Sequence, residues 1–125
     1  MPMLGMYAQE PPVIVAKKAD YQVLARNSGT VYTTIGATGA IVFTLPPITD
    51  GPFHFIFING VDKSMSVNAS TADTMLTMND VAADGIQFNT TAERIGGMVE
   101  VWCDGTTLFG FARLATEAQT PTLNT

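Results

Sequence analysis

The residues best suited to acid-base or nucleophilic chemistry in this sequence are one histidine, His54, and one cysteine, Cys103. A hydrolase of the Ser-His-Asp or Cys-His type would have to use His54 with a nucleophile from another part of the chain. Such catalysis also needs a group that orients the histidine, and the sequence indicates none. We therefore expect His54 to be a partly buried, hydrogen-bonded structural residue. The prediction is that the protein is not an enzyme, with a small hydrolase of unfamiliar type left open as an alternative.

Cys103 is followed by Asp104 and Gly105, and the sequence places no cation near it that would lower the pKa of its thiol. We interpret it as an inert, half-buried thiol. Because it is the single cysteine, an intramolecular disulfide and the usual four-ligand cysteine metal site are both excluded. Packing alone must hold the fold together.

Three carboxylates, Asp73, Asp80 and Asp84, form the densest acidic group, and oxygen ligands of this kind suit hard cations such as Ca²⁺. Their spacing fits no known calcium loop, so we expect solvated turn carboxylates and predict no cofactor, with ion binding left open. The glycine-rich segment 36–39 precedes a strand-like run instead of a helix. It is therefore interpreted as a hairpin connection and not as a phosphate-binding loop.

Three aromatic residues near the C-terminus, Trp102, Phe109 and Phe111, have the chemistry of a platform for sugars or bases. Strand alternation places Phe109 and Phe111 on one face, where the commoner outcome is burial in a core. We expect them to be core residues.

The overall composition excludes several classes of partner. Hydrophobic residues make up 46% of the chain and charged residues 14%, which predicts a folded chain with part of its surface covered by a partner. Six basic against eleven acidic residues give a net charge of −5, with no basic cluster for a phosphate backbone, so nucleic acid is not an expected partner. No apolar run is long enough for a membrane span or a signal peptide. We expect a soluble protein made in a cytoplasm.

Apolar and polar residues alternate with period two through most of the chain, in runs rich in Val, Ile, Thr, Phe and Tyr. Frequent turns separate these runs, and the pattern predicts an all-β fold, either an antiparallel β-sandwich or a jelly-roll-like barrel. Asp104-Gly105 predicts a closing antiparallel hairpin. Residues 53–58 are apolar on both faces apart from His54, so we expect this strand at the centre, covered by core or by a subunit neighbour. The expected strands are 13–16, 21–26, 30–35, 40–45, 53–59, 64–68, 74–78, 86–89, 98–103 and 107–113.

The two ends differ in composition from the middle, so we expect an extended N-terminal arm (1–12), a single β domain (13–115) and a C-terminal tail (116–125). The arm carries three prolines, which disfavour a helix. It also carries four apolar residues that a freely solvated tail rarely presents together. These residues, which we expect to contact an apolar surface such as that of a neighbouring subunit, are Met3, Leu4, Met6 and Tyr7.

Three segments resemble modules of tailed-phage virion proteins: 31–46 (VYTTIGATGAIVFTLP), 50–55 (DGPFHF) and 99–105 (VEVWCDG). In that group a Thr-Gly-Ala turn, an alternating strand and a Leu-Pro pair precede a Gly-x-x-Phe strand, and a Cys-Asp-Gly hairpin ends the domain. The resemblance covers residues 29–112 and lies in the order of strands and turns more than in invariant residues.

Short stand-alone modules of this kind resemble capsid decoration, or cement, proteins, which sit as trimers on the outside of an icosahedral head. The resemblance implies a homotrimer bound to the major capsid protein on the outer surface of the virion, made in a bacterial cytoplasm. Met3, Leu4, Met6 and Tyr7 are then the expected contacts to the capsid or to a neighbouring subunit. It supplies no catalytic residues. Fused copies occur in tail fibres, so an appendage domain that binds a bacterial receptor or glycan remains the alternative.

Overall fold

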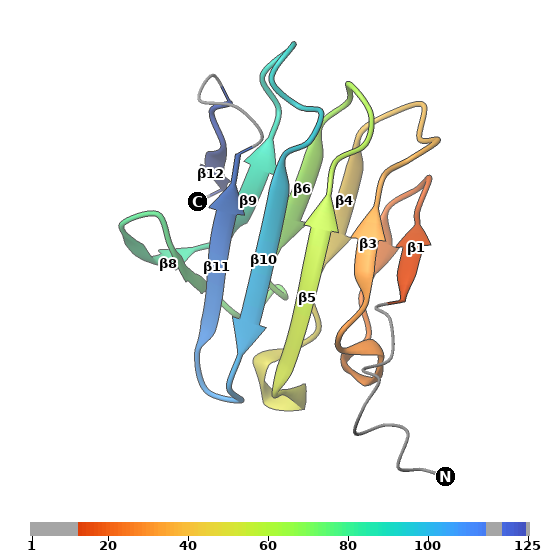
Figure 1. Ribbon diagram of the computed structural model, residues 1–125. Coiled ribbons are helices and arrows are strands. Elements are labelled where there is room, and N and C mark those ends of the chain that lie inside the picture. Colours follow the sequence, from red (N-terminus) through yellow and green to blue (C-terminus); the bar gives the residue numbers. More distant parts are fainter. Residues whose placement is uncertain (1–12, 115–118, 125) are drawn as a thin grey trace, which may run out of the picture.

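The computed structural model describes residues 13–114 and 119–124, which form two β-sheets packed face to face (Figure 1). The seven-stranded sheet contains, in spatial order, β1 (Ile14–Ala16), β3 (Val31–Thr33), β5 (Phe53–Ile58), β10 (Met98–Cys103), β11 (Leu108–Arg113), β7 (Met75–Thr77) and β8 (Asp80–Ala83). The five-stranded sheet contains β12 (Thr122–Asn124), β9 (Gly85–Phe88), β6 (Met65–Asn68), β4 (Ile41–Thr44) and β2 (Tyr21–Gln22). Two short 3₁₀ helices, η1 (Ala25–Asn27) and η2 (Ile48–Asp50), lie in connections. The predicted all-β sandwich is confirmed.

The core between the sheets is built from alternating residues that the pleat of each strand points inward. In β5 the three phenylalanines are buried and the residues between them are half exposed. The Phe57 ring lies 5.7 Å from the Tyr32 ring of the neighbouring strand β3 and 4.9 Å from the Phe43 ring of β4, which belongs to the other sheet. Aromatic contacts therefore join the two layers directly, and β5 lies between β3 and β10 as the expected central strand.

The strand pairing is mixed, so the expectation of antiparallel sheets is wrong for the first half of the chain and for the pair β7–β11, which is also parallel. β1, β3 and β5 pair in parallel in one sheet, and β2, β4 and β6 pair in parallel in the other. The reason is that the chain crosses to the opposite sheet after each of the first five strands, so that it re-enters each sheet in the same direction. The segment 36–39 is one of these crossings, because β3 and β4 lie in different sheets, and it is not the predicted hairpin.

The second half of the chain contains the predicted closing hairpin, in which β10 and β11 pair antiparallel. Gly105 in its turn has a φ of +93°, a conformation that glycine adopts without strain. The Asp104 carboxylate accepts hydrogen bonds from the backbone N–H groups of Thr106 (2.8 Å) and Thr107 (2.6 Å). These bonds hold the pKa of Asp104 below its usual value.

Some element boundaries differ from those predicted. The expected strand 21–26 ends at Gln22, and the chain continues into η1. The strands β8 and β12 were not among the expected ones. Because β12 pairs with β9, residues 122–124 of the expected C-terminal tail belong to the five-stranded sheet.

Candidate functional site

The most distinctive surface of the molecule is the side of the seven-stranded sheet that points away from the five-stranded sheet, which we call the outer face. The register of β5, β10 and β11 places residues of this face in three rows across the strands. The first row contains His54, Trp102 and Phe109, the second contains Ile56, Glu100 and Phe111, and the third contains Ile58, Met98 and Arg113. Parallel pairing adds Val31 beside Ile56, Ile14 beside Val31, and Leu76 beside Phe109.

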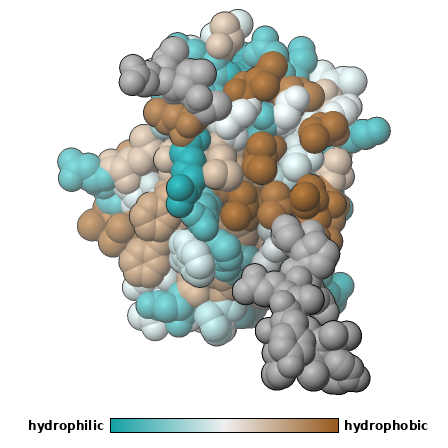
Figure 2. Space-filling model, viewed as in Figure 1, coloured by the Kyte–Doolittle hydropathy of each residue, from teal (hydrophilic) through white to brown (hydrophobic). Residues whose placement is uncertain are grey.

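Large apolar side chains on the outer face are open to solvent. The exposed fractions are 65% for Ile14, 47% for Trp102, 51% for Phe111 and 42% for Leu76. Figure 2 shows hydrophobic groups on both sides of a narrow hydrophilic band that runs along the strands. Monomeric soluble proteins seldom expose an apolar surface that extends across so many strands, and such surfaces mark interaction sites. We therefore take the outer face as the candidate functional site.

Polar groups on the outer face are paired with one another around Glu100. The Arg113 Nη2 donates to Glu100 Oε1 at 3.0 Å, and the His54 Nε2 lies 2.8 Å from Glu100 Oε2. Burial raises the pKa of the Glu100 carboxyl, but the hydrogen bonds from His54 and Arg113 and their charges outweigh burial, so the pKa is lowered. An apolar partner that covers the face would therefore meet a carboxylate whose charge is already compensated.

Replacing Glu100 with glutamine is expected to lower the free energy of unfolding by about 1 kcal/mol at neutral pH, a modest value because Arg113 is largely exposed. Ionised Glu100 stabilises the fold because its pKa is lowered on folding. This contribution is complete above the unfolded pKa of about 4.3 and is lost as the pH falls through the folded pKa. Denaturant unfolding at a series of pH values measures the effect. The control is Asp50→Asn at an exposed carboxylate, and a difference between wild type and Glu100→Gln that does not shrink in acid would contradict the assignment.

His54 is a partly exposed, hydrogen-bonded residue, as the sequence predicts. Its ring stacks on the Trp102 ring with 3.7 Å between centroids and an angle of 13°. Its hydrogen bond goes to Glu100, and its backbone N–H donates to the Ser28 hydroxyl at 2.9 Å. These contacts fix the orientation of Trp102 at the rim of a shallow hollow of about 260 Å³, which is lined by Ser28, Pro52, Phe53, His54, Trp102 and Cys103.

Cys103 is more buried than the predicted half-buried thiol, with an exposed fraction of 5%. Burial raises the pKa of its thiol. Its Sγ lies 3.8 Å from the carbonyl oxygen of Ile48. Both observations favour the protonated, unreactive form that the sequence predicts.

The prediction that Phe109 and Phe111 are core residues is wrong, since β11 turns both side chains to the outer face. Leu108 and Gly110 are the residues that point inward. A Cβ at Gly110 would clash with the side chain of Met75, which fills the space that a larger residue would need. The inward-facing position 110 therefore requires glycine, and alternation along β11 places Phe109 and Phe111 on the outer face.

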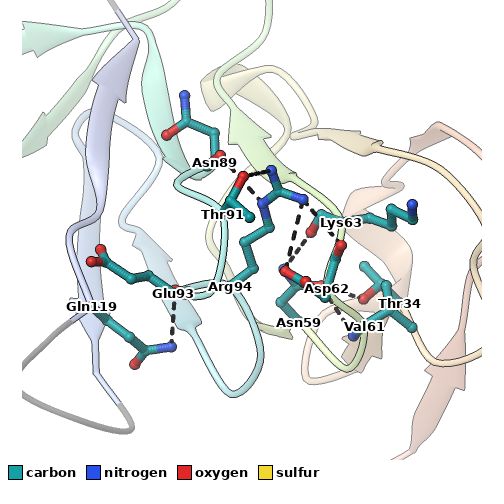
Figure 3. Close-up of polar contacts among 10 residues, drawn as sticks. All are labelled: Thr34, Asn59, Val61, Asp62, Lys63, Asn89, Thr91, Glu93, Arg94 and Gln119. Carbon is teal, nitrogen blue, oxygen red and sulfur yellow. Dashed lines mark hydrogen bonds and ion pairs between the residues drawn. The ribbon is translucent and has the colours of Figure 1, made fainter.

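At one end of the sandwich, polar contacts tie the loops around Asn59 and Arg94 together (Figure 3). Thr34 Oγ1 donates to the buried Asn59 side chain at 2.6 Å, and Asn59 Nδ2 donates to the Lys63 carbonyl at 2.8 Å. Arg94 donates to the carbonyl oxygens of Asn89 and Asp62 at 3.2 and 3.0 Å. The Arg94 guanidinium therefore connects loops, and we interpret the polar contacts at this end of the sandwich as structural.

Two of the three carboxylates considered for ion binding accept hydrogen bonds from backbone N–H groups. Asp73 accepts a hydrogen bond from the Ile48 N–H at 2.9 Å, and Asp80 accepts one from the Ala82 N–H at 2.8 Å. Asp73 and Asp84 line one hollow of about 240 Å³. Within residues 13–114 and 119–124, no group of three or more His, Cys, Asp or Glu side chains is arranged to hold a metal ion.

The predicted contact residues Met3, Leu4, Met6 and Tyr7 lie outside the described residues. In the described part of the chain no helix has the length and hydrophobicity to cross a membrane. Sequence alternation within 98–103 already places Met98, Glu100 and Trp102 on one face, but the pairing of Glu100 with Arg113 and His54 depends on neighbouring strands and was missed.

Comparisons with known protein families, with curated proteins and with solved structures found no match to this chain.

Proposed function

We propose that this protein is a structural virion component that binds the outside of a phage capsid as a homotrimer and stabilises the shell. The observation that carries the proposed assembly is the outer face, where large apolar side chains stay exposed around a paired Glu100 and Arg113 and offer a surface through which copies can join. The link to a capsid rests on the similarity of residues 29–112 to small virion modules. The net charge of −5 suits an outer position, because packed nucleic acid would repel it on the inside.

The proposed mechanism uses binding energy alone. Internal pressure loads a capsid at the joints between its major subunits, and a protein that binds the assembled lattice but not separated subunits stabilises the lattice by mass action. Three copies joined in one rigid body bind more tightly than one, because the second and third contacts form at high effective concentration. The apolar outer face is suited to the contacts that join such copies, since a neighbouring copy can cover its exposed side chains.

The alternative function is that of an appendage domain that binds a bacterial receptor or glycan. The observation that favours it is the exposed ring of Trp102 beside Glu100 and the hollow of about 260 Å³, an arrangement of aromatic and polar groups that suits a sugar. Location of the chain in the tail, or binding of bacterial surface glycan by the purified protein, would favour this function over the capsid role.

Heads that lack this protein are expected to assemble and then to break at a lower temperature or at a lower denaturant concentration than complete heads. Adding the purified protein back should restore their stability, and a variant with Phe111→Ser and Trp102→Ser should restore it less. Thermal release of packaged DNA measures the difference, and electron microscopy locates the bound protein. Equal stability of bare and reconstituted heads would contradict the capsid role.

A further inference from the structure

The outer face needs a cover that the described residues of one chain do not provide. Its apolar side chains extend from Ile14 at the edge strand β1 to Leu76 on β7, and both are exposed to solvent. Glu100 and Arg113, which lie between these edges, are paired with each other. A segment that covers this surface should therefore be apolar, carry little charge and be long enough to cross several strands.

Residues 1–12 have these properties. Their only charged side chain is Glu10, and they contain Met3, Leu4, Met6 and Tyr7. Methionine is flexible and fills irregular gaps between aromatic rings, with favourable sulfur–aromatic contacts. The exposed aromatic rings of Trp102 and Phe111 offer such contacts on the outer face.

We propose that residues 1–12 of one copy lie across the outer face of a neighbouring copy, with Met3, Leu4, Met6 and Tyr7 packed against its apolar side chains. This inference rests on the homotrimer of the proposed function and identifies the contact that holds it. Each arm joins unlike surfaces of two copies, and such contacts close into a ring when the rotation between copies allows it.

The position at which the described chain begins supports this arrangement. Val13 leads directly into β1, the edge strand of the same seven-stranded sheet, and Ile14 contributes its side chain to the outer face. Pro11 and Pro12 immediately precede Val13. Because proline fixes φ and restricts the preceding residue to extended conformations, this sequence favours an extended chain immediately before β1.

The length of the apolar part of the segment fits the central strands of the outer face. Strands in a sheet lie about 4.8 Å apart, so β3 and β11, which are separated by β5 and β10, are about 14 Å apart. Five extended residues such as 3–7 span about 16 Å. The apolar part of the segment can therefore contact both hydrophobic areas that flank the Glu100 and Arg113 pair.

Trp102 provides a direct test because it is the only tryptophan of the chain and lies on the outer face. In the full-length protein, fluorescence of Trp102 should be protected from acrylamide. Deletion of residues 2–10 should increase quenching several-fold, shift emission to longer wavelength and reduce the mass measured by light scattering from trimer to monomer. Serine at Met3, Leu4, Met6 and Tyr7 together keeps the length of the segment and should have the same effect. Circular dichroism verifies that each variant remains folded.

A mixing experiment decides between a neighbour's segment and the chain's own. A full-length Trp102→Phe copy has no tryptophan and serves as a silent donor of residues 1–12. Adding it to the protein lacking residues 2–10 should restore protection of Trp102, whereas the same donor with serine at Met3, Leu4, Met6 and Tyr7 should not.

The inference is overturned if Trp102 is equally accessible with and without residues 2–10. It is also overturned if the donor gives no protection while full-length protein is protected as a monomer, since the segment would then cover its own sheet. These measurements use purified protein without capsids. Failure of the reconstituted heads to gain stability would remove the capsid role and leave the arm contact standing.

Discussion

Replacing Phe57 with alanine is expected to lower the free energy of unfolding by about 3–5 kcal/mol. The Phe57 side chain is fully buried, and its ring contacts Tyr32 in its own sheet and Phe43 in the opposite sheet. Truncation removes the transfer energy of the ring and leaves a cavity between two rigid sheets that have little freedom to close it. Denaturant unfolding followed by circular dichroism measures the loss.

The matched control for this prediction is Phe111→Ala, which removes the same ring from the same sheet on its outer side. Because Phe111 is 51% exposed, we expect a loss below about 1 kcal/mol in the isolated chain. Phe111→Ala should instead weaken assembly. Similar losses of unfolding free energy for the two variants would mean that the inner and outer faces of the sheet have been misassigned.

Replacing Gly85 with alanine is expected to cost about 3 kcal/mol of unfolding free energy. A Cβ at this position would lie 2.8 Å from the Asn68 Cα and closer still to the Val67 carbonyl oxygen, both in β6. Backbone atoms cannot move aside as a flexible side chain can, so β9 would have to separate from β6. Gly85 also pairs with Asn124 of β12, and hydrogen exchange should therefore show faster exchange in β12.

Gly39→Ala is the control for Gly85→Ala, because no heavy atom lies within 4 Å of the position of its Cβ. This change should leave stability unchanged or raise it by up to about 1 kcal/mol through a less flexible unfolded chain. An equal loss at both positions would show that the close approach of β9 and β6 is not what makes glycine necessary at Gly85.

The local features of the fold were predictable from sequence. Alternation of large apolar residues identified β5 and β10, and the turn at Asp104-Gly105 identified the hairpin that joins β10 and β11. Both signals are local, since the period of a strand and the positive φ of a turn are properties of a few neighbouring residues. The direction of pairing was not predictable, because an alternating strand has the same pattern whether its neighbour runs parallel or antiparallel.

The candidate site was only partly predictable for a related reason. Alternation grouped Phe109 with Phe111, but the choice of the inward side depended on Met75, which packs against Gly110 from a strand far away in sequence. The strand β8 was missed because its residues are mostly exposed and lack a buried alternating set. The two-residue turn before β8 consists of Met78 and Asn79, both with positive φ. Methionine seldom adopts this conformation, so its presence in the sequence does not signal a turn.

The crossing of the chain between sheets after each early strand also has a consequence for the order of folding. Val31 must pair with Ile56, and Ile41 with Met65. Along the chain, a strand of the opposite sheet separates the two partners in each case. Neither pairing is a hairpin, so no early strand of a growing polypeptide has a partner until much more of the chain has been made. Topologies dominated by such distant pairings fold in about milliseconds to seconds. Local pairing is confined to hairpins of the second half of the described chain, β7–β8 and β10–β11. Once the β10–β11 hairpin has formed, β10 offers an edge on which β5 can pair.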